Sequence, residues 1–252
     1  MDATYDTLAL YITQKISSVY IKLNVFFISI LMLTTIFDRS HSPRDRFLVA
    51  IAGIPGSGKS TLAKTLVERV NELMGQNISI VVPMDGYHYP KKTLDTFPDP
   101  KEAYARRGAY WTFDVQGLLT LTEALRSPID SSQTITAPSF DHGKGDPVEN
   151  DIKILQSHKL VIMEGLYLHL KEPPAWKSIA SHMDELWFLH IDREIAKKRI
   201  IKRHIQSHLD ETEEQATFRV ENNDMVNADY ILENSLIPTR IVISVEVPNH
   251  AT

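Results

Sequence analysis

The stretch Phe47-Leu-Val-Ala-Ile-Ala-Gly53-Ile-Pro-Gly-Ser-Gly58-Lys-Ser-Thr61 decides the fold of this chain. Its first six residues, 47–52, are all apolar, which is typical of a strand buried on both faces of a parallel sheet. The residues that follow match the phosphate-binding pattern G-x-x-x-x-G-K-[ST]. We therefore expect a buried strand that leads directly into a loop for phosphate groups.

The chemistry of this loop follows from its residue types. Glycines allow consecutive backbone N–H groups to turn inward toward phosphate oxygens, which side chains would obstruct. Lys59 would reach the β- and γ-phosphates, and the hydroxyl of Ser60 would ligate Mg²⁺. Apolar residues then recur at helical spacing over 60–73. The predicted nucleotide-binding residues are Gly53, Ile54, Pro55, Gly56, Ser57, Gly58, Lys59, Ser60 and Thr61.

The rest of the sequence narrows the class of nucleotide-binding protein. The guanine-reading pattern N-K-x-D of GTPases is absent, and Asp114-Val-Gln-Gly117 alone is a weak match to D-x-x-G. Large motor and transporter ATPases need further signature segments, and this chain has too few residues to hold them. A small kinase needs instead one carboxylate to receive a hydroxyl proton, another near Mg²⁺, and basic residues over the phosphates.

Two acidic residues stand directly after predicted strands. Asp85 follows the apolar run 78–84, and Glu164 follows the run 159–163. The carboxyl ends of parallel strands line the ligand crevice, so Asp85 is placed for general-base work and Glu164 for Mg²⁺. A turn-forming Asp-Gly and a solvated strand end remain the alternative interpretations.

A basic segment over 193–209 supplies the third requirement. Arg199, Lys202 and Arg203 are three and four residues apart, so they share one face of a predicted helix. This face would close over the triphosphate as a helical lid and stabilise charge on the transferring group. A solvated helix face is the alternative interpretation.

Composition limits the remaining functions. The 252 residues contain no cysteine, which excludes disulfides, cysteine nucleophiles and thiolate-bound metals. The net charge of 27 − 32 = −5 argues against a broad nucleic-acid surface. We therefore expect no nucleic-acid partner.

One uncharged stretch, residues 23–37, precedes the loop. Its 15 residues would form a helix of about 22 Å, shorter than a hydrocarbon core of about 30 Å. The alternatives are a packed element, a membrane anchor, and translated non-coding sequence in a faulty gene model. We expect a cytoplasmic protein, with membrane association through residues 19–37 left open.

Four motifs, in this order, carry a family resemblance. They are the phosphate loop, Met84-Asp-Gly-Tyr-His88, Arg106-Arg-Gly-Ala-Tyr-Trp-Thr-Phe-Asp114 and Val161-Ile-Met-Glu-Gly165. Together they resemble the phosphoribulokinase/uridine kinase/pantothenate kinase group of P-loop kinases, especially its fungal ATP-dependent kinases. The resemblance covers residues 46–246, so residues 21–40 look like an insertion or a gene-model artefact.

The resemblance implies roles for individual residues. Asp85 matches the catalytic carboxylate, Glu164 the acidic residue associated with Mg²⁺, and Arg199 and Arg203 the lid. The segment 223–227, which begins with Asn223, falls on the adenine side. The implied substrate-side residues are His88, Arg106, Arg107, Asp114, Asp141 and His142. Tyr110 departs from the proline of the family pattern, which leaves the shape of that substrate loop open.

These observations predict a three-layer α/β P-loop NTPase fold over residues 46–252, behind an N-terminal lead of residues 1–45. The sheet would be mainly parallel, with helices on both faces and strands that include residues 47–52, 78–84, 159–163, 186–191 and 240–245. The predicted function is ATP- and Mg²⁺-dependent phosphorylation of a hydroxyl on a sugar, nucleoside or vitamin-like acid. The alternative is a regulatory or binding module with slow ATP hydrolysis, and a homodimer is left open.

Overall fold

The computed structural model describes residues 46–129, 134–207, 209 and 212–243. The predicted lead 1–45, with its apolar stretch 21–40, lies outside the described residues, as does the end of the last predicted strand. Among the helices of the described part, none has the length and hydropathy needed to cross a membrane.

Five parallel strands form the central sheet, in the order β2-β5-β1-β6-β7. In chain order they are β1 (Phe47–Ala52), β2 (Ser79–Pro83), β5 (Leu160–Glu164), β6 (Glu185–His190) and β7 (Arg240–Ile243). All five predicted strands are therefore present. The first four agree with the prediction to within one residue at each end, and β7 begins at the predicted residue.

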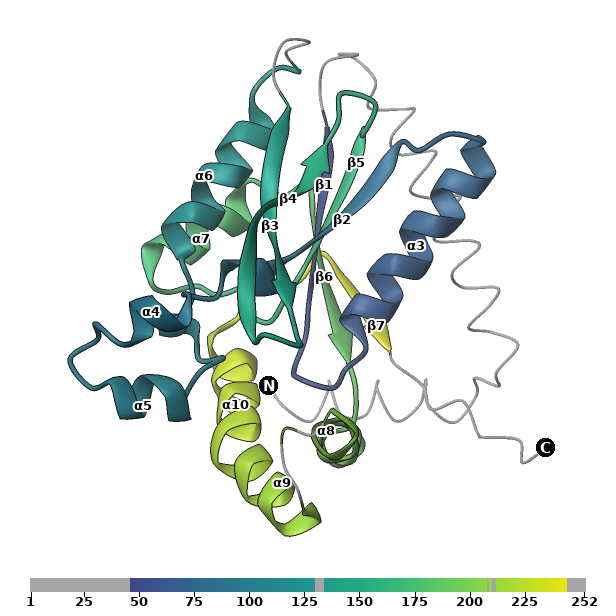
Figure 1. Cartoon of the computed structure of the whole chain (residues 1–252). Helices are drawn as coiled ribbons and strands as arrows, with labels where there is room; N and C mark the ends of the chain where they lie inside the picture. Colours follow the sequence, from purple (N-terminus) through teal and green to yellow (C-terminus); the bar gives the residue numbers. More distant parts are fainter. Residues whose placement is uncertain (1–45, 130–133, 208, 210–211, 244–252) are drawn as a thin grey trace, which may run out of the picture.

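Helices cover both faces of the sheet because the side chains of each strand alternate between the faces. On β1, Val49 and Ile51 pack in one apolar cluster with Leu66 of α3 (Lys59–Met74). Leu48 and Ala50 belong to a second cluster, with residues of α6 (Val115–Arg126) and α7 (Pro174–Ser181). Figure 1 shows α3 on one side of the sheet and α6 and α7 on the other. The predicted three-layer α/β fold is confirmed.

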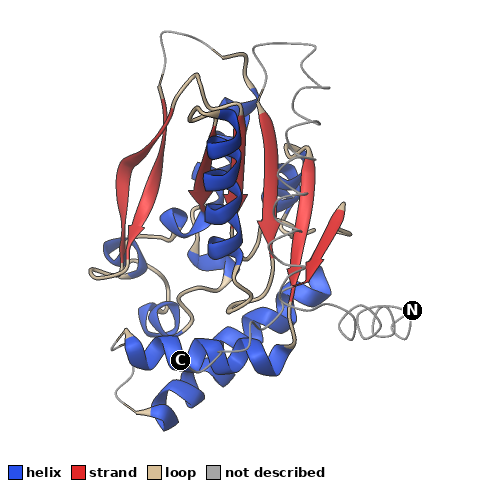
Figure 2. Cartoon of the chain, turned by 90° about the vertical axis from the view of Figure 1, so that its right-hand side faces the viewer, coloured by secondary structure: helices blue, strands red, loops and turns tan. Residues whose placement is uncertain are grey.

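A two-stranded antiparallel sheet, β3 (Ile135–Asp141) and β4 (Asp146–Ile154), lies beside the main sheet (Figure 2). No strand was predicted here from the sequence, because these half-exposed, polar strands lack a strong apolar pattern. The hairpin packs on a 3₁₀ turn, Met84–Tyr87, at the end of β2. A Cβ on Gly86 would lie 2.1 Å from the carbonyl oxygen of Pro138, so glycine permits this close approach.

Short helices gather at the carboxyl end of the sheet, below it in Figures 1 and 2. They are α4 (Lys91–Leu94), α5 (Pro100–Ala105), a 3₁₀ turn (Tyr110–Thr112), α8 (Arg193–Gln206), α9 (Glu213–Arg219), a π-helical turn (Val220–Asp224) and α10 (Met225–Asn234). A third apolar cluster joins this layer to the phosphate loop, since Ile54 packs with Ile200 and Val220.

The packing of α3 on the sheet gives a test of the core. Leu66 is fully buried, whereas Leu73 on the same helix is 39% exposed. Leu66→Ala should lower the free energy of unfolding by about 2–5 kcal/mol, because it leaves a cavity under the helix. Leu73→Ala, the matched control, should cost less than about 1 kcal/mol. Chemical denaturation followed by circular dichroism measures both, and equal losses would contradict this packing.

Candidate active site

Three neighbouring strands end side by side and define the candidate active site. Ile51 of β1 lies opposite Glu164 of β5, and Glu164 lies opposite Pro83 of β2. The phosphate loop begins two residues after Ile51, and Asp85 lies two residues after Pro83. The parallel register therefore brings together the loop and the two carboxylates that the sequence singled out.

The phosphate loop turns tightly against α8. Gly56 has a φ of +75°, in the left-handed region that favours glycine. A Cβ at this position would lie 2.6 Å from the carbonyl oxygen of Ala196 on α8. Glycine thus serves both the turn and the contact with the basic helix. The loop closes with a hydrogen bond from the Ser57 amide to the Ile54 carbonyl oxygen, at 3.2 Å.

Lys59 lies buried at the start of α3, inside the loop. Its Nζ donates to the carbonyl oxygen of Ile54 at 3.0 Å and to Oγ of Ser57 at 3.5 Å. Burial lowers the pKa of Lys59 to about 8, while Glu164 and Asp85 act in the opposite direction and raise it. The ammonium group is therefore held in the loop between neutral oxygens and within the field of both carboxylates.

Glu164 is buried and accepts a hydrogen bond from the hydroxyl of Ser60. Burial and the neighbouring charge of Asp85 raise the pKa of Glu164 to about 7, although Lys59 and Ser60 lower it. Two carboxylates with one lysine favour an additional cation. The described part of the chain has no cluster of three or more histidine or acidic side chains that could hold a metal alone. A hydroxyl with one or two carboxylates fits Mg²⁺ that is also bound by substrate phosphates.

The basic helix α8 contacts the phosphate loop through Arg199. Nη1 of Arg199 lies 3.5 Å from the carbonyl oxygen of Gly56. The positive charge of Arg203 contributes to the lowered pKa of Lys59, so this side chain also lies close to the loop. The structure thus places Arg199 beside the phosphate loop, and Arg203 lies one turn further along the same helix.

His88 connects the turn that carries Asp85 with the hairpin. Its Nδ1 lies 2.8 Å from the backbone oxygen of Asp85. Its ring packs against Phe113 and Phe140, with centroids 4.0 and 4.9 Å apart. Burial lowers the pKa of His88, while Asp85 acts to raise it. This predicted substrate residue therefore lies in the same site as the predicted base.

Arg107 holds the hairpin to the active-site turn. Its guanidinium donates to the carbonyl oxygens of Tyr89 and Gly145, and it pairs with Asp146 at 2.9 Å. The carbon Cζ also lies 5.7 Å from the ring centroid of Phe140. In the structure this residue anchors β4 next to the candidate site.

The other predicted substrate residues also shape this region. Asp114 caps α6 by accepting from the amide of Gly117 at 2.9 Å. Asp141 accepts from backbone amides in the hairpin turn, which lower its pKa. The ring of His142 packs edge-on against Phe140, with centroids 5.2 Å apart. The structure gives each of them a contact within the hairpin or α6.

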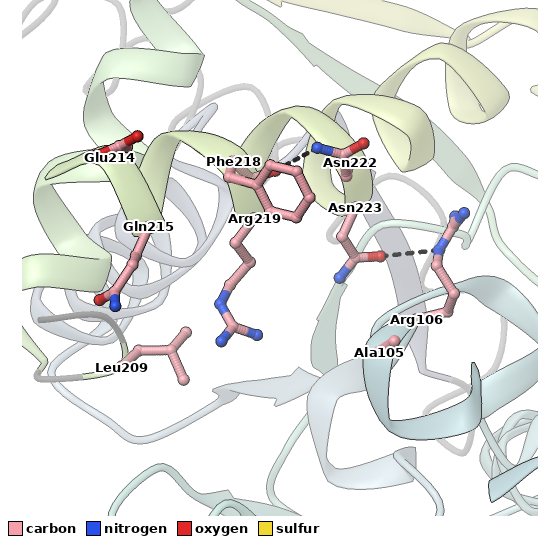
Figure 3. A pocket seen from close by; sticks show the side chains of 9 residues that line it. All are labelled: Ala105, Arg106, Leu209, Glu214, Gln215, Phe218, Arg219, Asn222 and Asn223. Atoms are coloured by element: carbon pink, nitrogen blue, oxygen red, sulfur yellow. Dashed lines mark hydrogen bonds between the residues drawn. The ribbon is translucent and has the colours of Figure 1, made fainter. Parts of the chain in front are cut away.

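Arg106 and Asn223 come together at the wall of a cavity of about 810 Å³ (Figure 3). Nε of Arg106 donates to Oδ1 of Asn223 at 3.2 Å. Asn223, which was predicted on the adenine side, therefore lies in contact with the predicted substrate residue Arg106. The polar and aromatic lining includes Arg106, Gln215, Phe218, Arg219, Asn222 and Asn223.

Sequence reasoning did not predict several of these residues. Asn227, the last residue of the segment 223–227 that the family resemblance places on the adenine side, accepts from Arg106 at 3.1 Å, a contact that the sequence did not predict. Phe218 and Arg219 carried no signal of their own. The hydroxyl of Tyr167 donates to the carbonyl oxygen of Gly108 at 2.6 Å, beneath the substrate-side segment.

The chain is similar to known proteins over most of its length. The profile of the phosphoribulokinase/uridine kinase family matches residues 48–235. A Schizosaccharomyces pombe protein named "Putative uridine kinase C227.14" is 40% identical over 195 residues, which cover 77% of this chain and 82% of that protein. An Aspergillus versicolor protein named "ATP-dependent kinase-like protein notR'" is 46% identical over 154 residues, which cover 61% of this chain and 89% of that protein.

Among solved structures, the crystal structure of a "putative fructose transport system kinase" from Silicibacter is similar to this chain. Its TM-score is 0.71 at 28% sequence identity, over 84% of this chain and 97% of that chain. The family profile spans most of the described residues, including the loop, both carboxylates and the basic helix. The chain therefore belongs to the phosphoribulokinase/uridine kinase family of P-loop small-molecule kinases.

Proposed function

We propose that this chain transfers the γ-phosphoryl group of ATP to a hydroxyl group of a small metabolite. The observation that carries the proposal is the convergence of Lys59, Asp85 and Glu164 at three adjacent strand ends. Phosphoryl transfer depends mainly on positioning and on charge stabilisation, and these residues supply both.

Asp85 would orient the acceptor hydroxyl and take its proton. Asp85 is a partly exposed residue in the 3₁₀ turn after β2, and its backbone oxygen lies 2.8 Å from Nδ1 of His88. As the hydroxyl oxygen forms its bond to phosphorus, the O–H proton passes to Asp85 and the bond from phosphorus to the bridging oxygen of ADP breaks. Lys59 and the lid arginines, Arg199 and Arg203, would stabilise the charge that spreads over the transferring group.

Ser60 and Glu164 would hold Mg²⁺ together with the phosphates of ATP. The hydrogen bond between them places the hydroxyl and carboxylate oxygens on the same side of the loop. A bound Mg²⁺ would neutralise charge on the β- and γ-phosphates. The loop amides and the buried Lys59 bind the same phosphates independently of the metal.

The acceptor belongs to the sugars, nucleosides or vitamin-like acids. The names of two similar proteins do not agree on an acceptor, since one is named as a uridine kinase and the other as a fructose transport system kinase. The chemistry shared by these acceptors is a free hydroxyl group, which is what Asp85 would activate. A screen of metabolites with γ-labelled ATP tests the proposal, and ADP formation without a labelled product in any sample would refute it.

Asp85→Asn should lower kcat by about 100-fold or more, because an amide cannot take the hydroxyl proton. Binding of ATP should be retained or tightened, because the substitution removes a negative charge near Lys59 and the phosphates. Steady-state kinetics on an acceptor found in the screen, with calorimetry for ATP, measures the two effects.

Asp151→Asn is the matched control, because Asp151 is exposed on β4. It makes the same chemical change outside the site and should keep full activity. The assignment of Asp85 as the base is wrong if Asp85→Asn keeps wild-type kcat while it binds ATP normally.

The pKa of Glu164 predicts a pH dependence of stability in the metal-free protein. Its pKa is about 7 in the folded state, against an ordinary value of 4.5, so folding favours the protonated form between these values. The contribution of Glu164 is fully present below about pH 4.5 and is lost as the pH rises through 7. The wild type should therefore lose on the order of 2 kcal/mol relative to Glu164→Gln between pH 5 and 7.5.

Urea denaturation of both proteins with a chelator present, at several pH values, measures this difference. Lys59 titrates mainly above this window, because its pKa of about 8 lies beyond the upper end. Stability curves that run parallel for the wild type and Glu164→Gln would contradict the raised pKa.

A further inference from the structure

The guanidinium of Arg106 is held in place by neutral groups. Its Nε donates to Oδ1 of Asn223 at 3.2 Å, and its Nη2 donates to Oδ1 of Asn227 at 3.1 Å. Over residues 46–129, 134–207, 209 and 212–243, no carboxylate forms an ion pair with Arg106. The side chain is therefore oriented while its charge is left without a counter-charge.

The two amides are themselves fixed. Nδ2 of Asn223 donates to the carbonyl oxygen of Arg107 at 3.2 Å, and Nδ2 of Asn227 donates to Oδ1 of Asn223 at 3.3 Å. Asn227 is only 4% exposed. Because the amide nitrogens are engaged elsewhere, both amide oxygens are directed at Arg106. The π-helical turn sets this arrangement, since it presents Asn223 one turn before Asn227.

Arg106 forms one wall of the cavity of about 810 Å³ (Figure 3). Across from it are the ring of Phe218, which is 69% exposed, and the side chain of Arg219, which extends into the same space. Glu214 lies at the far end of the cavity from Arg106. The Arg106 end of the cavity therefore carries a fixed positive charge, and the carboxylate of Glu214 lies away from it.

The cavity lies close to the phosphate loop. The π-helical turn that lines it packs its Val220 side chain in the apolar cluster of Ile54, which belongs to the phosphate loop. Burial raises the pKa of Tyr167, while the charges of Arg106 and Asp85 act on it in opposite directions. The hydroxyl of Tyr167 also donates to the carbonyl oxygen of Gly108, two residues after Arg106, at 2.6 Å.

We propose that this cavity binds the acceptor through an anionic group, a carboxylate or a phosphate, that Arg106 clasps while the hydroxyl lies at Asp85. This inference rests on the proposed function and narrows it to acceptors that are acids or phosphate esters. A guanidinium presents paired donors that match carboxylate and phosphate oxygens. An uncharged acceptor would leave the Arg106 charge uncompensated in a partly buried site, so it is disfavoured.

The test uses acceptor pairs that differ mainly in an anionic group. They are D-gluconate and D-glucose, D-ribose 5-phosphate and D-ribose, and uridine 5′-monophosphate and uridine. Binding of each compound to the full chain is measured by calorimetry in the presence of MgADP. In at least one pair the anionic member should bind at least about 10-fold more tightly than its neutral partner. A carboxylate and a phosphate are distinguished by which pair shows the preference.

Three variants test whether Arg106 causes the tighter binding of the anionic compounds. Arg106→Gln should abolish it, with a loss of roughly 10- to 100-fold in affinity for the anionic member and no change in affinity for MgADP. Arg106→Lys keeps the charge and should restore part of it. Arg69→Gln, at an exposed ion pair on α3, should leave it unchanged and controls for general charge.

The outcomes separate this inference from the proposed function. If neutral members bind as tightly as anionic ones, or if Arg106→Gln keeps the preference, the cavity does not select anions through Arg106. Phosphorylation of neutral acceptors alone would also overturn the inference while supporting the kinase function. Anion-selective binding that needs Arg106, with no phosphorylation of any acceptor, would support the anion site and contradict the proposed transfer.

Discussion

The parallel register of β2, β5 and β1 is the constraint on which the rest of the site depends. Backbone hydrogen bonds hold these three strands so that Pro83, Glu164 and Ile51 lie opposite one another. The phosphate loop, the carboxylate of Glu164 and the turn with Asp85 therefore begin at one edge of the sheet. A shift of one residue in β5 would move Glu164 to the other face and separate it from the loop.

Burial removes hydration from the charged groups at this edge of the sheet. Lys59 and Glu164 both titrate near neutrality in the folded chain, because each loses hydration and each is only partly compensated by its neighbours. The triphosphate and a divalent cation would supply the missing charges of both signs. Arg106, which neutral amides hold at the neighbouring cavity, shows the same principle. The site is thus organised around charges that its ligands would complete.

Much of the architecture could be predicted from the sequence because buried parallel strands leave continuous apolar runs. The same runs located Asp85 and Glu164, which directly follow two of them. The β3–β4 hairpin and the π-helical turn could not be predicted, since neither has a regular apolar period. Tyr110 was noted only as a departure from a family pattern, but it stacks on Tyr230 of α10 at 4.7 Å. Contacts of this kind depend on tertiary packing between distant segments, and the roles of the site residues remain predictions.

A crystal structure of the full chain with Mg²⁺ and a non-hydrolysable ATP analogue tests the central claim most directly. The account predicts that the β- and γ-phosphates lie in the loop against Lys59, with Mg²⁺ bound by Ser60 near Glu164. It also predicts that the carboxylate of Asp85 faces the γ-phosphate across a space wide enough for one hydroxyl group. A triphosphate bound in the loop with its γ-phosphate directed away from Asp85 would contradict the claim.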